Sequence, residues 1–354
     1  MKILFLTKYS NLGASSRYRF YQFYDFFEEN GLECVTHPFL TDSYLNNLYS
    51  QKSNLLNILK AYIKRFLVIF SVWKYDLVVI EKEIFPYFPA IFEKIFKFFS
   101  IKYIVDYDDA LFHQYDKHNK KLVRILLGSK IASVMKNASL VLAGNKYLSD
   151  YAKHAGAKNV KIIPTVIDIN KYSDKKIMDN EKIIIGWIGS PSTTKYVSGL
   201  ESVFLKLKEK YNIQISLIGA SKSPFVKMPV EMIPWSEKTE VEEMKKFDIG
   251  IMPLIDNFWE KGKCGFKLIQ YMGCALPVVG SPVGVNSEII DHGVNGYLAS
   301  SNSEWFDYLE KLIKEKNSRV KLGINGKDKV KLDYSKQELK KQILSLYTNV
   351  INRI

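Results

Sequence analysis

The sequence predicts an α/β protein built from two doubly wound parallel sheets. The chain has 354 residues, a length that suits two domains that each bury a core. Segments such as Leu77–Ile80 and Ile249–Met252 lack polar alternation, which is typical of parallel strands covered on both faces. These segments alternate with longer helical stretches, and the series restarts after the polar interval Asn170–Lys182. Two successive series of this kind predict two domains.

We place the joint between the domains near Pro164–Asn170. This predicts an N-terminal domain over residues 1–165 and a C-terminal domain over residues 166–335. The stretch 336–354 is helical by pattern and is predicted to pack back toward the N-terminal domain. The predicted strands are Ile3–Leu6, Cys34–His37, Leu77–Ile80, Tyr103–Asp106, Leu140–Ala143, Lys161–Ile163, Ile183–Trp187, Gln214–Ile218, Glu231–Ile233, Ile249–Met252, Pro277–Val279 and Gly296–Leu298.

The composition indicates a folded protein, with 47% hydrophobic and 25% charged residues. Three cysteines without a C-x-x-C spacing argue against a disulfide framework and against a zinc site, so we expect a reducing compartment and no metal. The start of the chain lacks a signal-peptide pattern, and no apolar run approaches the roughly 18 residues of a membrane span. We therefore expect a cytoplasmic location.

The net charge is +14 and is unevenly distributed. Residues 1–165 hold 23 Lys and Arg against 14 Asp and Glu, which gives +9, and the remainder holds 28 against 23, which gives +5. A basic half suits nucleic acid, an anionic membrane or a phosphorylated substrate. No groove-reading motif accompanies the charge, so nucleic acid is not an expected partner.

Two aromatic-rich, lysine-containing stretches, Leu55–Lys74 and Phe85–Lys102, lie in this basic half. Such a composition is typical of a helix that lies in a membrane surface with its cations at anionic head groups. The alternative is a helix that packs on the N-terminal sheet with its lysines toward water. The basic excess favours peripheral contact with the inner face of the plasma membrane.

The stretch Phe258–Ala299 contains a Gly- and Lys-rich loop, a helix start and a strand. Backbone N–H groups at a helix start bind anions, and here the start is predicted at Gly265 and Phe266. Lys263 and Lys267 add positive charge, and Gln270 shares a helix face with Lys267. The stretch therefore predicts a phosphate site with a nearby hydroxyl contact. The alternative is a loop, helix and strand whose lysines are solvated.

A second phosphate segment is predicted directly after the first strand of the C-terminal half. Gly189 and Ser190 begin this segment and Lys195 ends it, so hydroxyl groups and an ammonium group lie close together in sequence. The same residues also suit an ordinary helix-start turn.

In the N-terminal half, two segments that follow strands are candidate binding loops. The loop containing Gly13 opens a helix with Ser15 or Ser16 as the predicted N-cap. Arg17 and Arg19 are candidates for bidentate contacts with a phosphate group, and the alternative is a solvated first turn. Asp108 and Asp109 end another strand, where ligands of open α/β sheets bind, so we predict contacts with hydroxyl groups of a ligand. The alternative for Asp109 is a helix N-cap.

The stretch Phe258–Ala299 resembles the family 4 retaining glycosyltransferases of the GT-B fold. In that family a loop and helix carry two glutamates separated by seven residues, followed by an apolar Pro-Val-Val strand, and the run Gly284–Leu298 also matches. The resemblance covers nearly the whole chain and implies two Rossmann-like domains facing across a cleft. The N-terminal domain is expected to bind the acceptor, through Arg17, Arg19 and Asp108, and the C-terminal domain the nucleotide sugar.

The resemblance also implies roles for single residues. Gln270 replaces the second glutamate, which contacts the donor ribose, and Gly262 replaces the first, with Glu260 the nearest acid. Ser190 replaces an arginine of the diphosphate clamp, and Lys195 matches its lysine. Further positions implied by the resemblance are Ile233 and Trp235 at the nucleotide base and Gly13 across from the donor phosphates.

The expected reaction is a metal-independent glycosyl transfer of the EC 2.4 type, with retention and with a nucleoside-diphosphate sugar as co-substrate. Asp109, Lys195 and Lys267 are the expected catalytic residues. The acceptor is expected to be a saccharide or lipid-linked saccharide in cell-surface glycan assembly, such as O-antigen or capsule. The alternatives are a nucleotide-sugar 2-epimerase on the same fold and a non-catalytic nucleotide-sugar-binding partner subunit.

Overall fold

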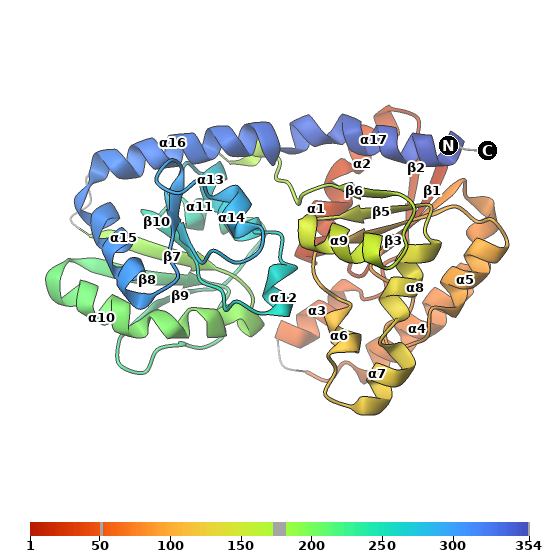
Figure 1. Cartoon of the computed structure of the whole chain (residues 1–354), viewed down its shortest axis with the longest axis horizontal. Coiled ribbons are helices and arrows are strands. Elements are labelled where there is room, and N and C mark those ends of the chain that lie inside the picture. The colour runs from red at the N-terminus through yellow and green to blue at the C-terminus, as the bar shows by residue number, and fades with distance from the viewer. Residues whose placement is uncertain (50–51, 173–181, 353–354) are drawn as a thin grey trace. The chain divides into compact units, whose positions relative to one another are not determined.

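The computed structural model describes residues 1–49, 52–172 and 182–352 (Figure 1). It divides into two compact units. Unit 1 consists of Met1–Thr165, Gly262–Cys264 and Leu339–Ile354, and unit 2 consists of Val166–Lys261 and Gly265–Glu338. Within the described residues, each unit contains a six-stranded sheet in which all pairs of neighbouring strands are parallel. The predicted α/β class with two doubly wound sheets is therefore confirmed.

The sheet of unit 1 has the strand order β2-β1-β3-β4-β5-β6. Its strands are β1 (Lys2–Leu6), β2 (Glu33–Thr36), β3 (Leu77–Glu81), β4 (Tyr103–Tyr107), β5 (Leu140–Ala143) and β6 (Val160–Ile162). The helices are α1 (Ala14–Arg19), α2 (Tyr24–Glu29), α3 (Asp42–Tyr49), α4 (Leu55–Ile69), α5 (Ile91–Phe98), α6 (His113–Asp116), α7 (Lys121–Leu127), α8 (Lys130–Asn137), α9 (Lys146–His154) and most of α17 (Lys336–Asn352), with 3-10 turns η1 (Tyr21–Phe23) and η2 (Val72–Lys74).

Side chains alternate along each strand, so both faces of this sheet carry apolar side chains. Helices cover both faces. On one face, the ring of Phe5 in β1 lies 6.1 Å from that of Tyr347 in α17. On the other face, Leu4 and Leu6 belong to a core cluster with residues of α4, α5, α8 and α9. Strands covered on both faces need apolar residues at every position, which explains the continuous apolar segments in the sequence.

The sheet of unit 2 has the strand order β12-β11-β10-β7-β8-β9. This order reverses between β7 and β10, and open α/β sheets bind ligands beyond the carboxyl ends of strands at such a point. The strands are β7 (Ile183–Ile188), β8 (Ile213–Ile218), β9 (Glu231–Ile233), β10 (Ile249–Met252), β11 (Val278–Gly280) and β12 (Gly296–Leu298). The helices are α10 (Glu201–Lys210), α11 (Glu240–Met244), α12 (Phe258–Lys261), α13 (Phe266–Gly273), α14 (Asn286–Ile289), α15 (Asn302–Lys314) and α16 (Lys316–Asp333), with 3-10 turns η3 (Ile169–Lys171), η4 (Pro191–Tyr196) and η5 (Ser198–Leu200).

The two faces of the second sheet pack against different helices. Ile185 and Trp187 of β7 belong to a core cluster with residues of α10 and α15. On the opposite face, Gly250 of β10 faces α13, where a Cβ atom would lie 2.5 Å from the ring of Tyr271. The glycine lets α13 approach the sheet closely, so the start of this helix lies near the carboxyl ends of β7 and β10.

Candidate functional site

The first part of the candidate site is the turn at the carboxyl end of β7. A Cβ atom on Gly189 would lie 2.4 Å from the ring of Trp187 and 2.7 Å from the hydroxyl of Thr193. Gly219, which follows β8 with a φ of 81°, has room for no Cβ atom either, because it would meet the carbonyl oxygen of Gly189 at 2.2 Å. The backbone after β7 therefore contacts the backbone after β8 with no side chain between them, which lets a ligand approach closely.

Polar side chains follow Gly189 in the same turn. Ser190 is the N-cap residue of η4, and its backbone N–H donates to the hydroxyl of Thr193 at 3.2 Å. Lys195 is exposed on the same turn, and its ammonium group lies 5.3 Å from the ring centre of Tyr196. The structure thus places Gly189, Ser190 and Lys195 on one short turn at the switch point of unit 2.

The start of α13 supplies the second part of the site. Gly265 is the N-cap residue and has a φ of 63°, where a Cβ atom would meet Ile289 at 2.3 Å. The helix then begins at Phe266, as predicted. The ammonium group of Lys267 lies 5.3 Å from the ring centre of Trp187, two residues before Gly189. A helix N-terminus and a lysine therefore lie beside the turn after β7, which is a favourable setting for an anion.

Glu260, the acid nearest to the position of the first glutamate in the resembling family, is hydrogen-bonded to Tyr196. Glu260 in α12 is buried, and one of its carboxylate oxygens accepts a hydrogen bond from the hydroxyl of Tyr196. Burial and the neighbouring Glu260 carboxylate raise the pKa of Tyr196, so this hydroxyl stays protonated and keeps donating. The contact joins η4 to α12 and thereby fixes the turn that carries Lys195.

The residues predicted at the nucleotide base lie at the end of β9. Ile233 ends this strand, and its carbonyl oxygen accepts a hydrogen bond from Gly219 at 2.9 Å. Trp235 is half-buried, and its indole N–H donates to Glu240 at 2.7 Å. The structure therefore places both residues beside Gly219 and leaves part of the Trp235 ring accessible.

Gln270 and Lys263 have partners away from the turn after β7. Gln270 is only 3% exposed, and its Nε2 atom donates to the hydroxyl of Tyr172 at 3.2 Å. The contact of Gln270 with a ribose stays a prediction. Lys263 lies in the segment that belongs to unit 1, where its carbonyl oxygen accepts a hydrogen bond from Asn145 at 3.0 Å.

In unit 1, a charged cluster lies beyond the carboxyl ends of β3 and β4. The ammonium group of Lys82 lies 2.8 Å from Asp108 Oδ1 and 2.7 Å from Asp109 Oδ2. Burial opposes ionisation of Asp108, but the Lys82 ammonium group outweighs it and lowers the pKa of Asp108 well below its usual range. Among the described residues, no group of His, Cys, Asp or Glu side chains is placed to hold a metal ion.

The backbone of Lys82 is itself constrained. Its φ is 68°, a conformation that residues other than glycine rarely adopt. The hydroxyl of Tyr107 donates to the Lys82 carbonyl oxygen at 2.6 Å, and Lys82 N–H donates to the Asp106 carbonyl oxygen at 3.0 Å. Strained backbone that neighbouring groups hold in place is found most often at functional sites. Lys82 was not among the residues predicted from the sequence, although the charged run Glu81-Lys-Glu directly after a buried strand was a usable signal.

The serines after Gly13 contact this cluster and do not cap α1. Helix α1 begins at Ala14 with Gly13 as its N-cap residue, so the predicted N-cap at Ser15 or Ser16 is wrong. The Ser15 hydroxyl lies 2.6 Å from Asp108 Oδ2, and the Ser16 hydroxyl donates to Glu81 at 2.6 Å. Because α1 already begins at Ala14, Ser15 and Ser16 lie inside its first turn, and their hydroxyls are directed toward carboxylates of the cluster. A Cβ atom on Gly13 would meet Tyr9 at 2.3 Å, so the loop requires glycine there.

Asp109 does not act as a helix N-cap either, because α6 begins at His113 after Phe112. Its side chain instead pairs with Lys82, and its Oδ1 atom has no hydrogen-bond partner among the described residues. This Oδ1 atom is buried, whereas the Asp109 side chain as a whole is 28% exposed.

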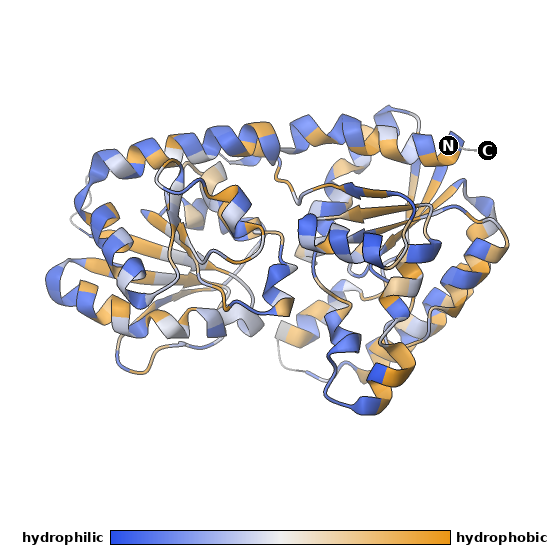
Figure 2. Cartoon of the chain, in the orientation of Figure 1, coloured by the Kyte–Doolittle hydropathy of each residue, from blue (hydrophilic) through white to orange (hydrophobic). Residues whose placement is uncertain are grey.

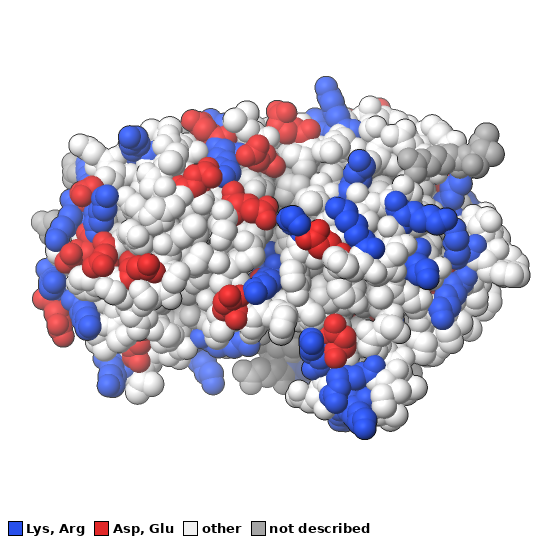
Figure 3. Space-filling view, in the orientation of Figure 1, with Lys and Arg blue, Asp and Glu red and all other residues white. Residues whose placement is uncertain are grey.

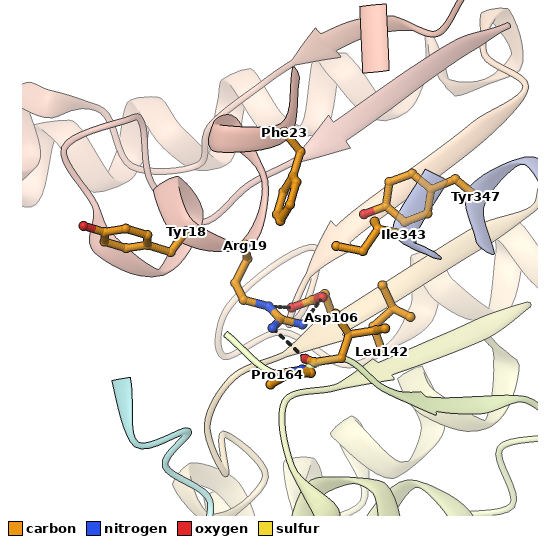
Figure 4. Close-up of a pocket in the computed structure, with 9 residues that line it drawn as sticks. Tyr18, Arg19, Phe23, Asp106, Leu142, Pro164, Ile343 and Tyr347 are labelled. Carbon is orange, nitrogen blue, oxygen red and sulfur yellow. Dashed lines mark hydrogen bonds and ion pairs between the residues drawn. The ribbon is translucent and has the colours of Figure 1, made fainter. Parts of the chain in front are cut away.

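Arg19 is an internal residue and not the exposed acceptor contact that the sequence suggested (Figure 4). Its Nε and Nη2 atoms donate to the two carboxylate oxygens of Asp106 at 2.8 and 2.7 Å, and Nη1 donates to the Ile163 carbonyl oxygen at 2.7 Å. The guanidinium group is buried by neighbours that include Tyr347. All three guanidinium nitrogens of Arg19 donate hydrogen bonds within unit 1, so this side chain is not available to a ligand. The prediction that Arg19 contacts an acceptor phosphate is therefore corrected.

Arg17 is also buried and engaged. Its Nη1 atom donates to the carbonyl oxygens of Asn11 and Leu12 at 3.1 and 3.4 Å, and its guanidinium group lies 4.9 Å from the ring centre of Tyr18. Arg17 therefore fixes the loop that precedes α1, and the alternative of a solvated first turn does not hold for either arginine.

Comparison with known proteins finds a family that part of unit 2 resembles. Residues 168–329 match the family described as glycosyl transferases group 1. This range contains the turn after β7 and the start of α13. A relative, an uncharacterised glycosyltransferase of Methanocaldococcus jannaschii, is 24% identical over 274 residues, which cover 71% of this chain and 66% of the relative. The chain thus spans slightly less than two thirds of that relative's length.

Similar solved structures extend over both units. The Anabaena protein HepE in complex with UDP-glucose has a TM-score of 0.72 at 16% identity and covers 99% of this chain and 100% of its own. Sucrose-phosphate synthase of Thermosynechococcus elongatus has a TM-score of 0.71 at 11% identity and covers 99% of each chain. The chain therefore has the GT-B fold.

Proposed function

We propose that this chain is a retaining glycosyltransferase that moves a sugar from a nucleoside-diphosphate sugar to an acceptor hydroxyl. The observation that carries the proposal is the position of Lys267 and the α13 start beside Gly189, inside the region that matches glycosyl transferases group 1. HepE, which shares the fold, was solved with UDP-glucose, and this supports the nucleotide-sugar class of donor.

In the proposed reaction, the bond between the anomeric carbon and the diphosphate oxygen breaks while the acceptor oxygen bonds to the same face of the sugar. Negative charge then develops on the leaving diphosphate. Lys267, Lys195 and the N–H groups at the start of α13 stabilise this charge by preorganised electrostatics. The leaving phosphate accepts the proton of the acceptor hydroxyl, so no protein carboxylate has to act as a nucleophile.

The carboxylates of unit 1 are proposed to bind the acceptor. Lys82 keeps Asp108 ionised, and the partly exposed side chain of Asp109 lies beside it. An ionised carboxylate is a strong acceptor for a hydroxyl of the sugar acceptor. We further propose a saccharide or lipid-linked saccharide acceptor in cell-surface glycan assembly, a cytoplasmic chain in peripheral contact with the membrane, and transfer that needs no metal ion.

The proposal is tested first by thermal-shift binding to a panel of nucleotide sugars and then by transfer assays with saccharide and lipid-linked acceptors. Product NMR should show the anomeric configuration of the donor, and a chelator should leave the rate unchanged. Lys267→Ala should lower the transfer rate on the order of 100-fold. The matched control is Lys206→Ala, which removes an exposed lysine of α10 and should have no effect.

Three results would contradict the proposal. Interconversion of the free donor without any acceptor would identify a 2-epimerase. Tight donor binding with neither transfer nor slow hydrolysis would identify a non-catalytic subunit. Equal transfer rates for Lys267→Ala and Lys206→Ala would show that Lys267 does not stabilise the leaving diphosphate.

A further inference from the structure

Helix α4 exposes an apolar side to solvent. Leu55, Leu59, Ile63, Phe66 and Phe70 are all exposed, and the first of them is 74% exposed. At about 3.6 residues per turn, their spacing puts them on one face of the helix. An amphipathic helix of a soluble domain normally turns its apolar face inward, so the exposed face of α4 requires another explanation.

The buried side of α4 accounts for its attachment to unit 1 without this exposed face. Ala61, Arg65 and Ile69 are its buried residues. The guanidinium group of Arg65 donates to the carbonyl oxygens of Thr7 and His37 at 2.8 and 2.9 Å. The helix is therefore fixed by a mixed polar and apolar side, while the more apolar side remains uncovered.

Helix α5 continues the exposed apolar surface. Ile91, Ile95 and Phe98 are exposed and spaced four and three residues apart, and Phe98 is 81% exposed. The ring of Phe92 in α5 lies 6.2 Å from that of Phe66 in α4. The two helices thus form one surface, and residues of α4 and α5 appear orange in Figure 2.

Helix α7 adds three more exposed apolar residues. Leu122, Ile125 and Leu126 are each more than 60% exposed. Tyr87, in the segment before α5, lies 6.3 Å from the ring of His118, shortly before α7. We call the exposed apolar side chains of α4, α5 and α7 the apolar face of unit 1. Surfaces of this extent on a soluble protein mark an interaction site.

The charges around the apolar face have one sign. Helices α4 and α7 contain Lys60, Lys64, Lys121 and Arg124 and no acidic residue. The one acid of α5, Glu93, is buried and accepts a hydrogen bond from the Ile84 N–H at 3.2 Å. In the view of Figure 3, Lys and Arg predominate over the region of α5, α7 and α8.

We infer that the apolar face of unit 1 docks on an anionic lipid bilayer. The apolar side chains enter the boundary between head groups and acyl chains, and the lysines and Arg124 contact anionic head groups. A second copy of the chain would bring these cations against each other, whereas an anionic membrane complements them. None of the described helices is long and apolar enough to cross a membrane. The inference deepens the membrane contact given under the proposed function, rests on unit 1 alone, and is tested separately from the proposed reaction.

The first test is sedimentation of the full chain with vesicles of phosphatidylcholine, with and without phosphatidylglycerol. We expect binding to vesicles that contain phosphatidylglycerol, and weaker binding at high salt. Leu59→Gln with Ile63→Gln should weaken binding about 100-fold, because each side chain that no longer enters the bilayer costs roughly tenfold. Both positions are exposed, so the substitutions should leave thermal unfolding unchanged. Val226→Gln with Leu332→Gln alters two exposed apolar residues of unit 2 and is the matched control.

A second test places the face in the bilayer. Trp73 is 61% exposed, and its ring lies 5.4 Å from that of Phe99 just after α5. Brominated lipids should quench tryptophan emission of the chain and quench the Trp73→Phe variant less. The inference is overturned if the chain stays in the supernatant with phosphatidylglycerol vesicles. It is also overturned if Leu59→Gln with Ile63→Gln binds like the unaltered chain, or abolishes a dimer that forms in buffer.

Discussion

Lys82 and Asp108 form a buried ion pair, with 2.8 Å between the ammonium nitrogen and carboxylate Oδ1. The pair joins the end of β3 to the residue after β4, and the same ammonium group also contacts Asp109. Lys82 thus neutralises two adjacent carboxylates where a sheet of this type binds ligands. The pair both stabilises unit 1 and sets the charge of the candidate acceptor site.

Replacing Lys82 by Met should destabilise unit 1 by about 3 kcal/mol or more, because it leaves buried carboxylates without their counter-ion. The effect should depend on pH. In the unaltered chain, the folded pKa of Asp108 is depressed, so its contribution to stability is fully present above its unfolded pKa and is lost as pH falls through the folded pKa. In Lys82→Met, burial dominates and raises that pKa, so stability should increase as pH falls from 7 to 5.

Thermal unfolding across pH 4 to 8 measures this difference. Lys2→Met is the control, since Lys2 forms a 2.7 Å ion pair with Glu33 on the exposed surface and should matter little. Parallel pH profiles for Lys82→Met and the unaltered chain would show that Lys82 does not govern the ionisation of Asp108.

Replacing Arg19 by Lys keeps the positive charge but removes the fork that holds Asp106 and Ile163. We expect a loss of about 2 kcal/mol in the free energy of unfolding, measured by urea denaturation. Donor affinity should not change, because Arg19 lies in unit 1 and the donor contacts proposed for Lys195 and Lys267 lie in unit 2. Unchanged stability combined with a raised KM for the acceptor would restore the ligand contact that the sequence suggested.

Lys82 and Arg19 show where prediction from the sequence ends. All twelve predicted segments overlap strands of the described residues and differ from them by at most one residue at an end. The inner strands such as β3 and β10 were predictable because strands buried on both faces are apolar throughout. The start of α13 after Gly265 was also predictable, because glycine and helix periodicity act locally. By contrast, Arg19 pairs with a carboxylate 87 positions away, and the sequence shows only a basic residue in a first helical turn. Which charges are buried together is fixed by tertiary packing.

Replacing Gly189 by Ala should disturb the turn after β7, since the new Cβ atom would overlap the ring of Trp187 and the hydroxyl of Thr193. We expect a loss of about 1 to 3 kcal/mol in the free energy of unfolding and weaker binding of the nucleotide sugar. Gly199→Ala is a matched control in the same unit, because a Cβ atom there would meet nothing within 4 Å. Calorimetric titration with the donor separates the two variants, and equal donor affinity for both would argue against a binding role for this turn.

Replacing Asp109 by Asn tests the partly exposed carboxylate that lies beside Lys82. The amide keeps the shape of the side chain but loses the charge beside Lys82, so a hydrogen bond from an acceptor hydroxyl becomes weaker. We expect kcat/KM for the acceptor to fall about tenfold or more, while the donor dissociation constant stays constant. Asp150→Asn, which alters an exposed carboxylate of α9 paired with Lys146, is the control and should leave both constants unchanged. If Asp109→Asn instead lowers only thermal stability, Asp109 serves the fold through Lys82, and the acceptor contact must come from Asp108 or another residue.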